Sequence, residues 1–127
     1  MSEPFLYRDG DLDLRGEIHH PVASSNGRGI LVVHEADGIG GNVRRRCAML
    51  AELGYIAAAA DMHGAGRVLA PPEIEAAMTR FKETPDLLRR RTSAALDAFL
   101  AATGLAHDQT AAIGYWGAFA GGGEILR

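Results

Sequence analysis

The sequence predicts an α/β fold in three layers: a mainly parallel sheet between helices, with an antiparallel hairpin at its N-terminal end. Two apolar runs, at residues 30–33 and 55–60, have the composition of strands that are buried on both faces of a sheet. Residues 43–53 between them carry apolar side chains at helical spacing. A strand, a helix and a second strand in this order form a βαβ unit, whose two strands lie parallel.

The N-terminal residues predict a β-hairpin. Asp9-Gly10 separates residues 5–7 from residues 12–20, and Asp-Gly between two strand-like segments favours a tight turn with positive φ. Apolar and polar side chains alternate along the second segment. This alternation is typical of an antiparallel strand that buries one face and exposes the other.

The strand at 30–33 ends in a polar loop. His34 and Glu35 follow it directly, and a glycine-rich loop at residues 38–41 leads to Asn42, which can cap a helix. In open α/β sheets, ligands bind beyond the carboxyl ends of the strands, so we expect the chemistry of this protein at this loop. We expect His34 to pack against the following helix rather than to bind a ligand.

The first predicted helix has one apolar face. Val43, Cys47, Leu50 and Leu53 share this face, and Gly54 ends the helix. Cys47 is therefore expected to be a buried, inert thiol rather than a nucleophile. As the only cysteine of the chain, it cannot form an internal disulfide.

The second predicted strand, 55–60, ends on the same rim of the sheet as the first. Asp61 follows it, and we expect its carboxylate to accept hydrogen bonds from backbone N–H groups of the loop. Residues 62–72 predict an irregular segment above this rim. Within it, Arg67 is a candidate for holding a substrate carboxylate.

The rest of the chain continues the alternation of helices and strands. Helices are predicted over 73–83 and, after Pro85, over 86–103, because apolar residues recur there at helical spacing. A third apolar strand is predicted over 111–115, followed by a glycine-rich turn at 117–123.

The last residues, 124–127, begin what the pattern predicts as another helix, and a single helical turn is not stable by itself. We therefore expect one α/β domain over residues 1–127 that is either the N-terminal part of a larger domain or is completed by a partner. An open sheet edge favours pairing with another copy of the chain, so a homo-oligomer is one expected assembly.

Composition excludes several classes of function. The net charge of −3 offers no basic surface for nucleic acid, and the longest apolar stretch is far shorter than the ~20 residues of a membrane span. No secretion signal is recognisable, which predicts a cytoplasmic protein. The histidines show no metal-binding spacing, so we expect neither a metal nor a cofactor.

The order of these parts resembles the dienelactone hydrolase family of the α/β-hydrolase fold. The matching pieces are Val-Val-His-Glu at 32–35 with Gly38, Leu-Gly-Tyr at 53–55 with Asp61 and Gly64, and Ile-Gly-Tyr at 113–115. The resemblance covers nearly the whole chain. It implies an α/β-hydrolase-like domain that hydrolyses small esters or lactones through a covalent acyl-enzyme.

At the nucleophile turn the sequence departs from the family pattern. The family has Gly-x-Cys-x-Gly there, whereas Trp116 stands at the cysteine position and Ala118 at the second glycine. A shifted register places Phe119 at the nucleophile position, which is equally inert. The family's later Asp and His are not found in this chain either, so we expect this chain alone to be inactive.

The resemblance carries over the first half of the catalytic site. Glu35 matches the family's glutamate beside the nucleophile, and Ala36 matches the residue whose backbone N–H contributes to the oxyanion hole. A donor of this kind stabilises the transition state by roughly 3 to 4 kcal/mol. Paired with an arginine or simply solvated, Glu35 would instead have no catalytic role.

Arg44 is a further candidate for binding substrate. It lies in the first turn of a predicted helix, where the macrodipole disfavours positive charge. We expect it either to meet an anionic substrate or Glu35, or to lie on a solvated helix face.

Two other functions compete with the hydrolase. In a noncatalytic binding or structural domain, Trp116 or Phe119 would fill the former pocket. Nucleotide binding is disfavoured, because the last glycine of Gly-x-Gly-x-x-Gly would fall at Val43 and the chain has no Gly-Lys-Ser/Thr.

Overall fold

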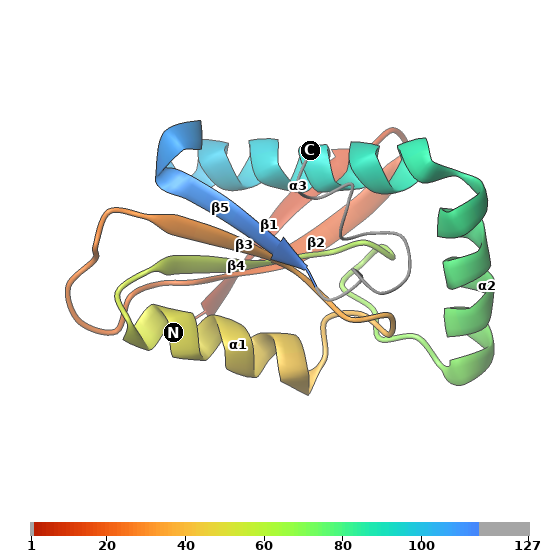
Figure 1. Ribbon diagram of the computed structural model, residues 1–127, viewed down its shortest axis with the longest axis horizontal. Coiled ribbons are helices and arrows are strands. Elements are labelled where there is room, and N and C mark those ends of the chain that lie inside the picture. Colours follow the sequence, from red (N-terminus) through yellow and green to blue (C-terminus); the bar gives the residue numbers. More distant parts are fainter. Residues whose placement is uncertain (1, 115–127) are drawn as a thin grey trace.

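The computed structural model describes residues 2–114 and shows a five-stranded sheet between helices (Figure 1). The strands are β1 (Ser2–Asp9), β2 (Leu12–His19), β3 (Gly29–Val33), β4 (Ile56–Ala60) and β5 (Thr110–Gly114). The helices are α1 (Gly41–Glu52), α2 (Pro71–Glu83), α3 (Pro85–Thr103) and the short η1 (His107–Gln109). Helices α1 and α3 cover opposite faces of the sheet, and α2 stands at its end (Figure 1). The predicted three-layer α/β fold is confirmed.

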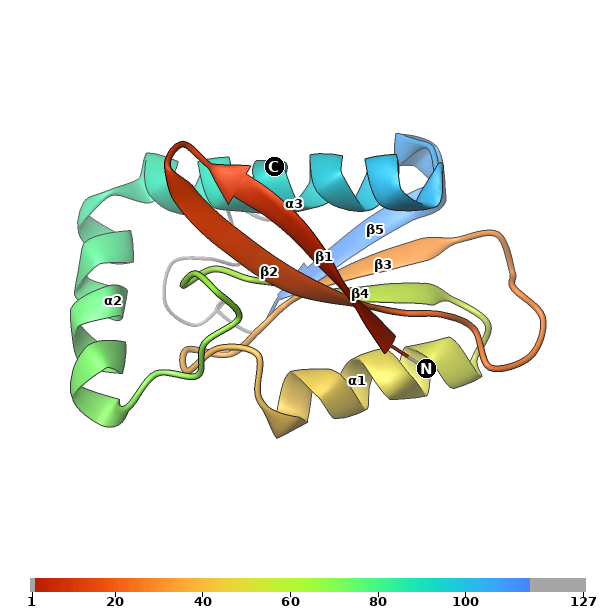
Figure 2. The same ribbon diagram turned by 180° about the vertical axis from the view of Figure 1, so that it is seen from behind.

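The sheet has the order β1-β2-β4-β3-β5. Strand β3 pairs in parallel with both β4 and β5, whereas β2 pairs antiparallel with β4. The β1–β2 hairpin, with Gly10 at a φ of 60° in its turn, extends the sheet on the far side of β4 (Figure 2). The sheet is therefore mainly parallel at its centre, with the expected antiparallel hairpin.

Alternate side chains of the central strands pack into two separate hydrophobic cores, one on each face of the sheet. Leu31 and Val33 point toward α3, where the core includes Phe99, whereas Val32 points toward α1 and meets Cys47. The strand β4 is almost entirely alanine, so both helix layers approach it closely. Both faces of β3 and β4 are buried, as their apolar composition predicts.

Three details differ from the sequence prediction. Leu53 is 66% exposed, because α1 ends before it and Ala51 takes the buried place on that helix. Helix α2 begins at Pro71 rather than at residue 73, and α3 begins at Pro85. Proline is favourable in the first turn of a helix, since its missing N–H has no partner there in any case.

The predicted turn at 117–123 and residues 124–127 lie outside the described residues. Within residues 2–114, no helix combines the length and the apolar character that crossing a bilayer requires.

Candidate functional site

The polar residues that follow β3 and β4 meet at one rim of the sheet. Val33 pairs with Ala60, so the segment from His34 onward lies beside the segment from Asp61 onward. This is the rim that the sequence predicts for the site, and the structure brings its two strand ends together.

Asp61 organises the loop after β4. It is fully buried, and its carboxylate accepts hydrogen bonds from the backbone N–H groups of His63 (3.1 Å), Gly64 (3.0 Å), Gly66 (2.8 Å) and Arg15 (3.0 Å). The predicted interpretation of Asp61 as an acceptor for loop N–H groups is confirmed. Four such bonds hold residues 61–66 in one conformation and tie them to β2.

His34 is a buried connector between the two strand ends. Its Nδ1–H donates to the Glu35 carbonyl at 2.6 Å, and its Nε2 accepts the Met62 N–H at 3.0 Å. Burial, followed by the nearby His63, lowers the pKa of His34 to about 4, so the ring is neutral at pH 7. We expected this ring to pack against the following helix. Its Nε2 instead reaches the segment after β4, because the Met62 N–H lies within hydrogen-bond distance there.

His63 is a second connector, which sequence reasoning did not single out. Its Nε2–H donates to the Ala36 carbonyl at 2.7 Å, and its ring lies 4.9 Å from that of His34 and 6.0 Å from that of Phe81. Burial lowers its pKa as well. The only sequence signal is its position two residues after a strand-ending aspartate.

Glu35 lies on the α1 side of the rim. Its carboxylate accepts a hydrogen bond from Asn42 Nδ2 at 3.3 Å, and Asn42 in turn accepts one from Arg45. These residues line a hollow of about 170 Å³ at the start of α1. Asn42 is not the helix cap that we expected, because α1 starts two residues earlier, with Gly40 at the N-cap position.

Arg44 contacts neither Glu35 nor this hollow. Its Nε and Nη2 atoms bind both carboxylate oxygens of Glu17 on β2, at 2.6 to 3.2 Å. Arg45 is the arginine of this turn that lines the hollow beside Glu35. Helical geometry explains the difference, because consecutive residues point about 100° apart around the helix axis.

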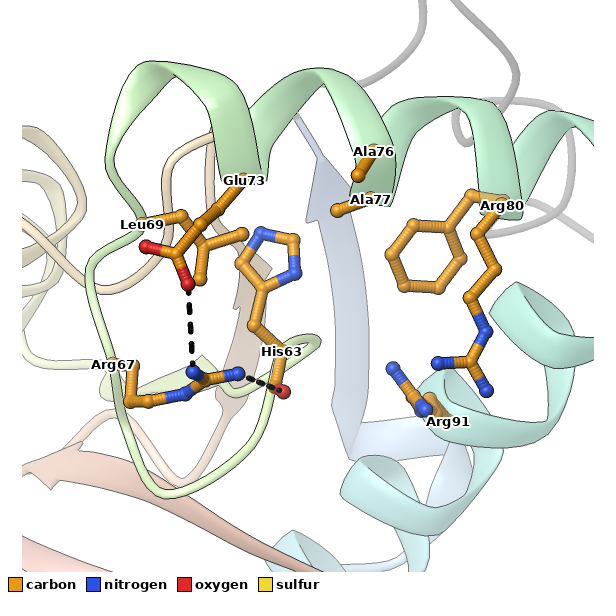
Figure 3. Close-up of a pocket in the computed structure, with 9 residues that line it drawn as sticks. His63, Arg67, Leu69, Glu73, Ala76, Ala77, Arg80 and Arg91 are labelled. Carbon is orange, nitrogen blue, oxygen red and sulfur yellow. Dashed lines mark hydrogen bonds and ion pairs between the residues drawn. The ribbon is translucent and has the colours of Figure 1, made fainter.

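Arg67 lies in a different hollow, on the α2 side of the rim (Figure 3). This hollow has a volume of about 300 Å³ and is lined by His63, Arg67, Leu69, Glu73, Ala76, Ala77, Arg80, Phe81 and Arg91. The Arg67 guanidinium lies 3.8 Å from the Glu73 carboxylate and 3.5 Å from the His63 carbonyl. Arg80 and Arg91 lie across the hollow from it (Figure 3). Glu35 and Arg67 are thus not brought into one hollow.

Arg91 is the most firmly held cation of this second hollow. Its Nε donates to the buried carboxylate of Asp9 at 3.1 Å, its Nη1 donates to the Met62 carbonyl at 2.7 Å, and its guanidinium lies 5.5 Å from the centre of the Phe81 ring. Arg90 binds the same carboxylate at 2.6 Å. Asp9 and Arg91 are 82 residues apart, so no local sequence pattern points to this pair.

Gly38 joins the two hollows by close backbone contact. Its φ is +123°, and a Cβ atom there would lie 2.3 Å from the Arg67 carbonyl oxygen. The neighbouring Leu69 N–H donates to the Asp37 carbonyl at 2.7 Å. Only glycine fits this position, which keeps the loop of Glu35 against the loop of Arg67.

Other predicted features have mixed outcomes. Cys47 is completely buried in the core beneath α1, which confirms the predicted burial, and this burial raises the pKa of its thiol to about 12. Trp116 lies outside the described residues. Among residues 2–114, no group of three or more histidine, cysteine or acidic side chains is arranged to hold a metal ion.

Comparison with known proteins gives a consistent result. The sequence model of the dienelactone hydrolase family matches residues 14–122. A dienelactone hydrolase-like promiscuous phosphotriesterase from metagenomic libraries is 31% identical, with a TM-score of 0.85. A structure called m3DLH is 32% identical, with a TM-score of 0.84. Each alignment covers 99% of this chain and 52% of the other.

A more distant structure shares the fold. The dienelactone hydrolase from Anabaena variabilis is 20% identical with a TM-score of 0.65, over 99% of this chain and 55% of that one. A search among curated proteins found no match. The chain therefore spans about half the length of the metagenomic phosphotriesterase and of m3DLH.

Proposed function

Because the chain belongs to the dienelactone hydrolase family, we propose that residues 2–114 supply the oxyanion-hole side and the substrate pocket of a site that hydrolyses small esters or lactones. The observation that carries this proposal is the Glu35–Ala36 segment at the end of β3. It lies at the central rim of the sheet and is bonded through His63 to the wall of the Arg67 hollow.

Ala36 is the proposed oxyanion-hole donor. Within residues 2–114, its N–H makes no hydrogen bond, although the carbonyls on both sides of it are bonded. A half-buried rim with a fixed, open N–H can stabilise negative charge that develops on a carbonyl oxygen. In the same proposal, Glu35 acts beside the nucleophile position.

The Arg67 hollow is the proposed substrate pocket. Three guanidinium groups and one carboxylate line it, so it favours an ester or lactone that carries a negative group. Arg67 remains the candidate that sequence reasoning chose, and Arg91 joins it. Arg44 is not proposed as a substrate contact, because both Nε and Nη2 of its guanidinium bind Glu17.

We propose that this chain by itself does not turn substrate over, since an indole at position 116 cannot attack a carbonyl. The competing function, a noncatalytic binding domain, uses the same pocket. We further propose a small-molecule partner, no cofactor and a cytoplasmic location. We also propose that copies of the chain pair through β5, which is an edge strand of the sheet within residues 2–114 and whose Ile113 is 41% exposed.

Hydrolysis assays test the catalytic half of this proposal. The purified 127-residue chain is assayed with p-nitrophenyl acetate and with the phosphotriester paraoxon, because one relative is described as a phosphotriesterase. We expect rates equal to those in buffer. Turnover that disappears in Glu35→Ala would show that the chain is an enzyme by itself.

Binding tests the pocket. The half-ester monomethyl succinate is titrated into the 15N-labelled chain, with uncharged dimethyl succinate as the matched ligand. We expect the half-ester to shift the amide signals of Ala36 and His63 and to bind more tightly than the diester. Arg67→Ala should weaken binding of the half-ester about tenfold, as expected for one lost charge-assisted hydrogen bond, whereas Arg44→Ala should not. Equal binding of both ligands would contradict the anionic substrate class.

A further inference from the structure

The two peptide groups that flank Ala36 are each held by a histidine ring. The Glu35 carbonyl accepts from His34 Nδ1 at 2.6 Å, and the Ala36 carbonyl accepts from His63 Nε2 at 2.7 Å. The peptide bond between Glu35 and Ala36 is trans, so the Ala36 N–H points opposite to the Glu35 carbonyl. Whatever holds that carbonyl therefore also sets the direction of the N–H.

The tautomer of His34 follows from its partners. Its Nε2 faces the Met62 N–H at 3.0 Å and must accept, so Nδ1 carries the proton and must donate. Both His34 and Met62 are fully buried, so the ring has no room to rotate. The backbone after β4 thus fixes the proton position on His34, and His34 fixes the peptide after β3.

His63 completes the arrangement from the other side. Its own backbone N–H is bound by Asp61 at 3.1 Å, and its ring is packed against His34 and Phe81. The donor that reaches the Ala36 carbonyl therefore comes from a rigid loop. A turn contributes as well, because the Gly38 N–H also donates to the Glu35 carbonyl, at 3.2 Å.

We propose that His34 and His63 are positioning residues that aim the Ala36 N–H at the carbonyl oxygen of the substrate. This inference rests on the proposed function, in which Ala36 is the oxyanion-hole donor. It assigns to the two histidines neither proton transfer nor metal binding. Their role is to keep one backbone donor preorganised, so that it does not reorient when charge develops.

The first test reads the tautomers in the full chain without any ligand. Long-range 1H–15N spectra of the imidazole rings at pH 7.5 distinguish Nδ1–H from Nε2–H. We expect His34 as the Nδ1–H tautomer and His63 as the Nε2–H tautomer. Finding the Nε2–H tautomer at His34 would overturn the proposal, because that ring could not hold the Glu35 carbonyl.

The second test uses paired variants. His34→Asn keeps an N–H donor at the Nδ1 position, whereas His34→Leu has similar bulk and no donor. For His63, Gln keeps the Nε2 donor and Met removes it. Residual dipolar couplings report the direction of the Ala36 N–H. We expect this coupling to be kept in the Asn and Gln variants and changed in the Leu and Met variants, while couplings across β3 and α1 stay the same.

If the two histidines have only a structural role, both variants of His34 and both variants of His63 should lose stability. The dipolar coupling of the Ala36 N–H should then not change selectively. That result would refute the proposal and would show that the Gly38 turn alone orients the N–H. If His34→Leu does not fold, His34→Gln is used as the variant without a donor at the Nδ1 position. The amide group of glutamine lies beyond that position.

Ligand binding separates failure of this inference from failure of the proposed function. In the Asn and Gln variants we expect the Ala36 signal to respond to monomethyl succinate as in the unmodified chain, and in the Leu and Met variants we expect about tenfold weaker binding. No response in the unmodified chain would refute the proposed function. The tautomers and the dipolar couplings would still show whether His34 and His63 orient the Ala36 N–H. Equal binding in all variants would refute the positioning role.

Discussion

The two ends of the 34–45 segment are held in very different ways. At its start, His34 is buried, and with Asp61 and His63 it forms a network in which backbone groups are the main partners. At its end, Arg44 and Arg45 bind side chains at the surface. A buried polar group that loses its hydrogen-bond partner cannot bind water instead, so the folded state loses stability. An exposed charge that loses its partner is solvated, so little stability is lost. The comparison teaches that the rim, rather than the arginines of α1, determines the shape of the site.

Asp61→Ala is the substitution expected to have the largest effect on stability, and it tests the difference between the buried rim and the exposed arginines. Four backbone N–H groups would lose their acceptor, and each buried donor without a partner costs about 1 to 3 kcal/mol. Two of these donors, in His63 and Gly64, belong to buried residues, so we expect a loss of at least about 2 kcal/mol in the free energy of unfolding by urea, or failure to fold. The matched control is Asp13→Ala, because the Asp13 side chain is exposed and its ion pair with Arg8 lies at the surface. Equal losses in both variants would contradict the comparison.

Acid tests the same network through His34. Its pKa is about 4 in the folded chain and 6.5 as the ordinary value, so between these pH values the unfolded chain binds the extra proton. Stability should therefore fall as the pH drops from about 6.5 to 4, by on the order of 3 kcal/mol from this group. Urea unfolding at several pH values measures the slope, which should flatten in His34→Asn. An unchanged slope in that variant would show that another group is responsible.

The contact between the two loops is tested by Gly38→Ala. The added Cβ would lie 2.3 Å from the Arg67 carbonyl oxygen at a φ of +123°, so the loops must separate. We expect a loss of about 2 kcal/mol in the free energy of unfolding and a shifted Ala36 amide signal. Gly40→Ala is the control, because its φ is −106° and its nearest contact would be an ordinary 3.7 Å.

The smallest effect is expected at the surface. Arg44→Ala removes the ion pair with Glu17, in which the arginine side chain is half exposed. Such pairs contribute about 0 to 1 kcal/mol, and raising the salt concentration should reduce the difference further. Urea unfolding at low and high salt measures it. A loss as large as that of Gly38→Ala would remove the contrast between rim and surface.

The sequence by itself determined the layers, the parallel centre of the sheet and the rim where the polar loops after β3 and β4 meet. Apolar periodicity is local, so it shows which face of each strand or helix is buried. The role of Asp61 was equally predictable, because three of its four partners lie within five residues of it. The stripe that buries Cys47 is local as well, although Leu53 falls just beyond the last turn of its helix.

Only the tertiary structure decided which polar groups meet. Arg44 binds Glu17, His63 binds Ala36 and Arg91 binds Asp9, across 27 to 82 residues of chain. Periodicity identifies the buried face of an element, but not which residue of another element faces its polar groups. That pairing depends on register and on loop paths, which are settled when the sheet and helices pack. The hydrogen bonds from His34 and His63 to the two carbonyls that flank the Ala36 N–H could therefore be found only once β3 and β4 were placed side by side.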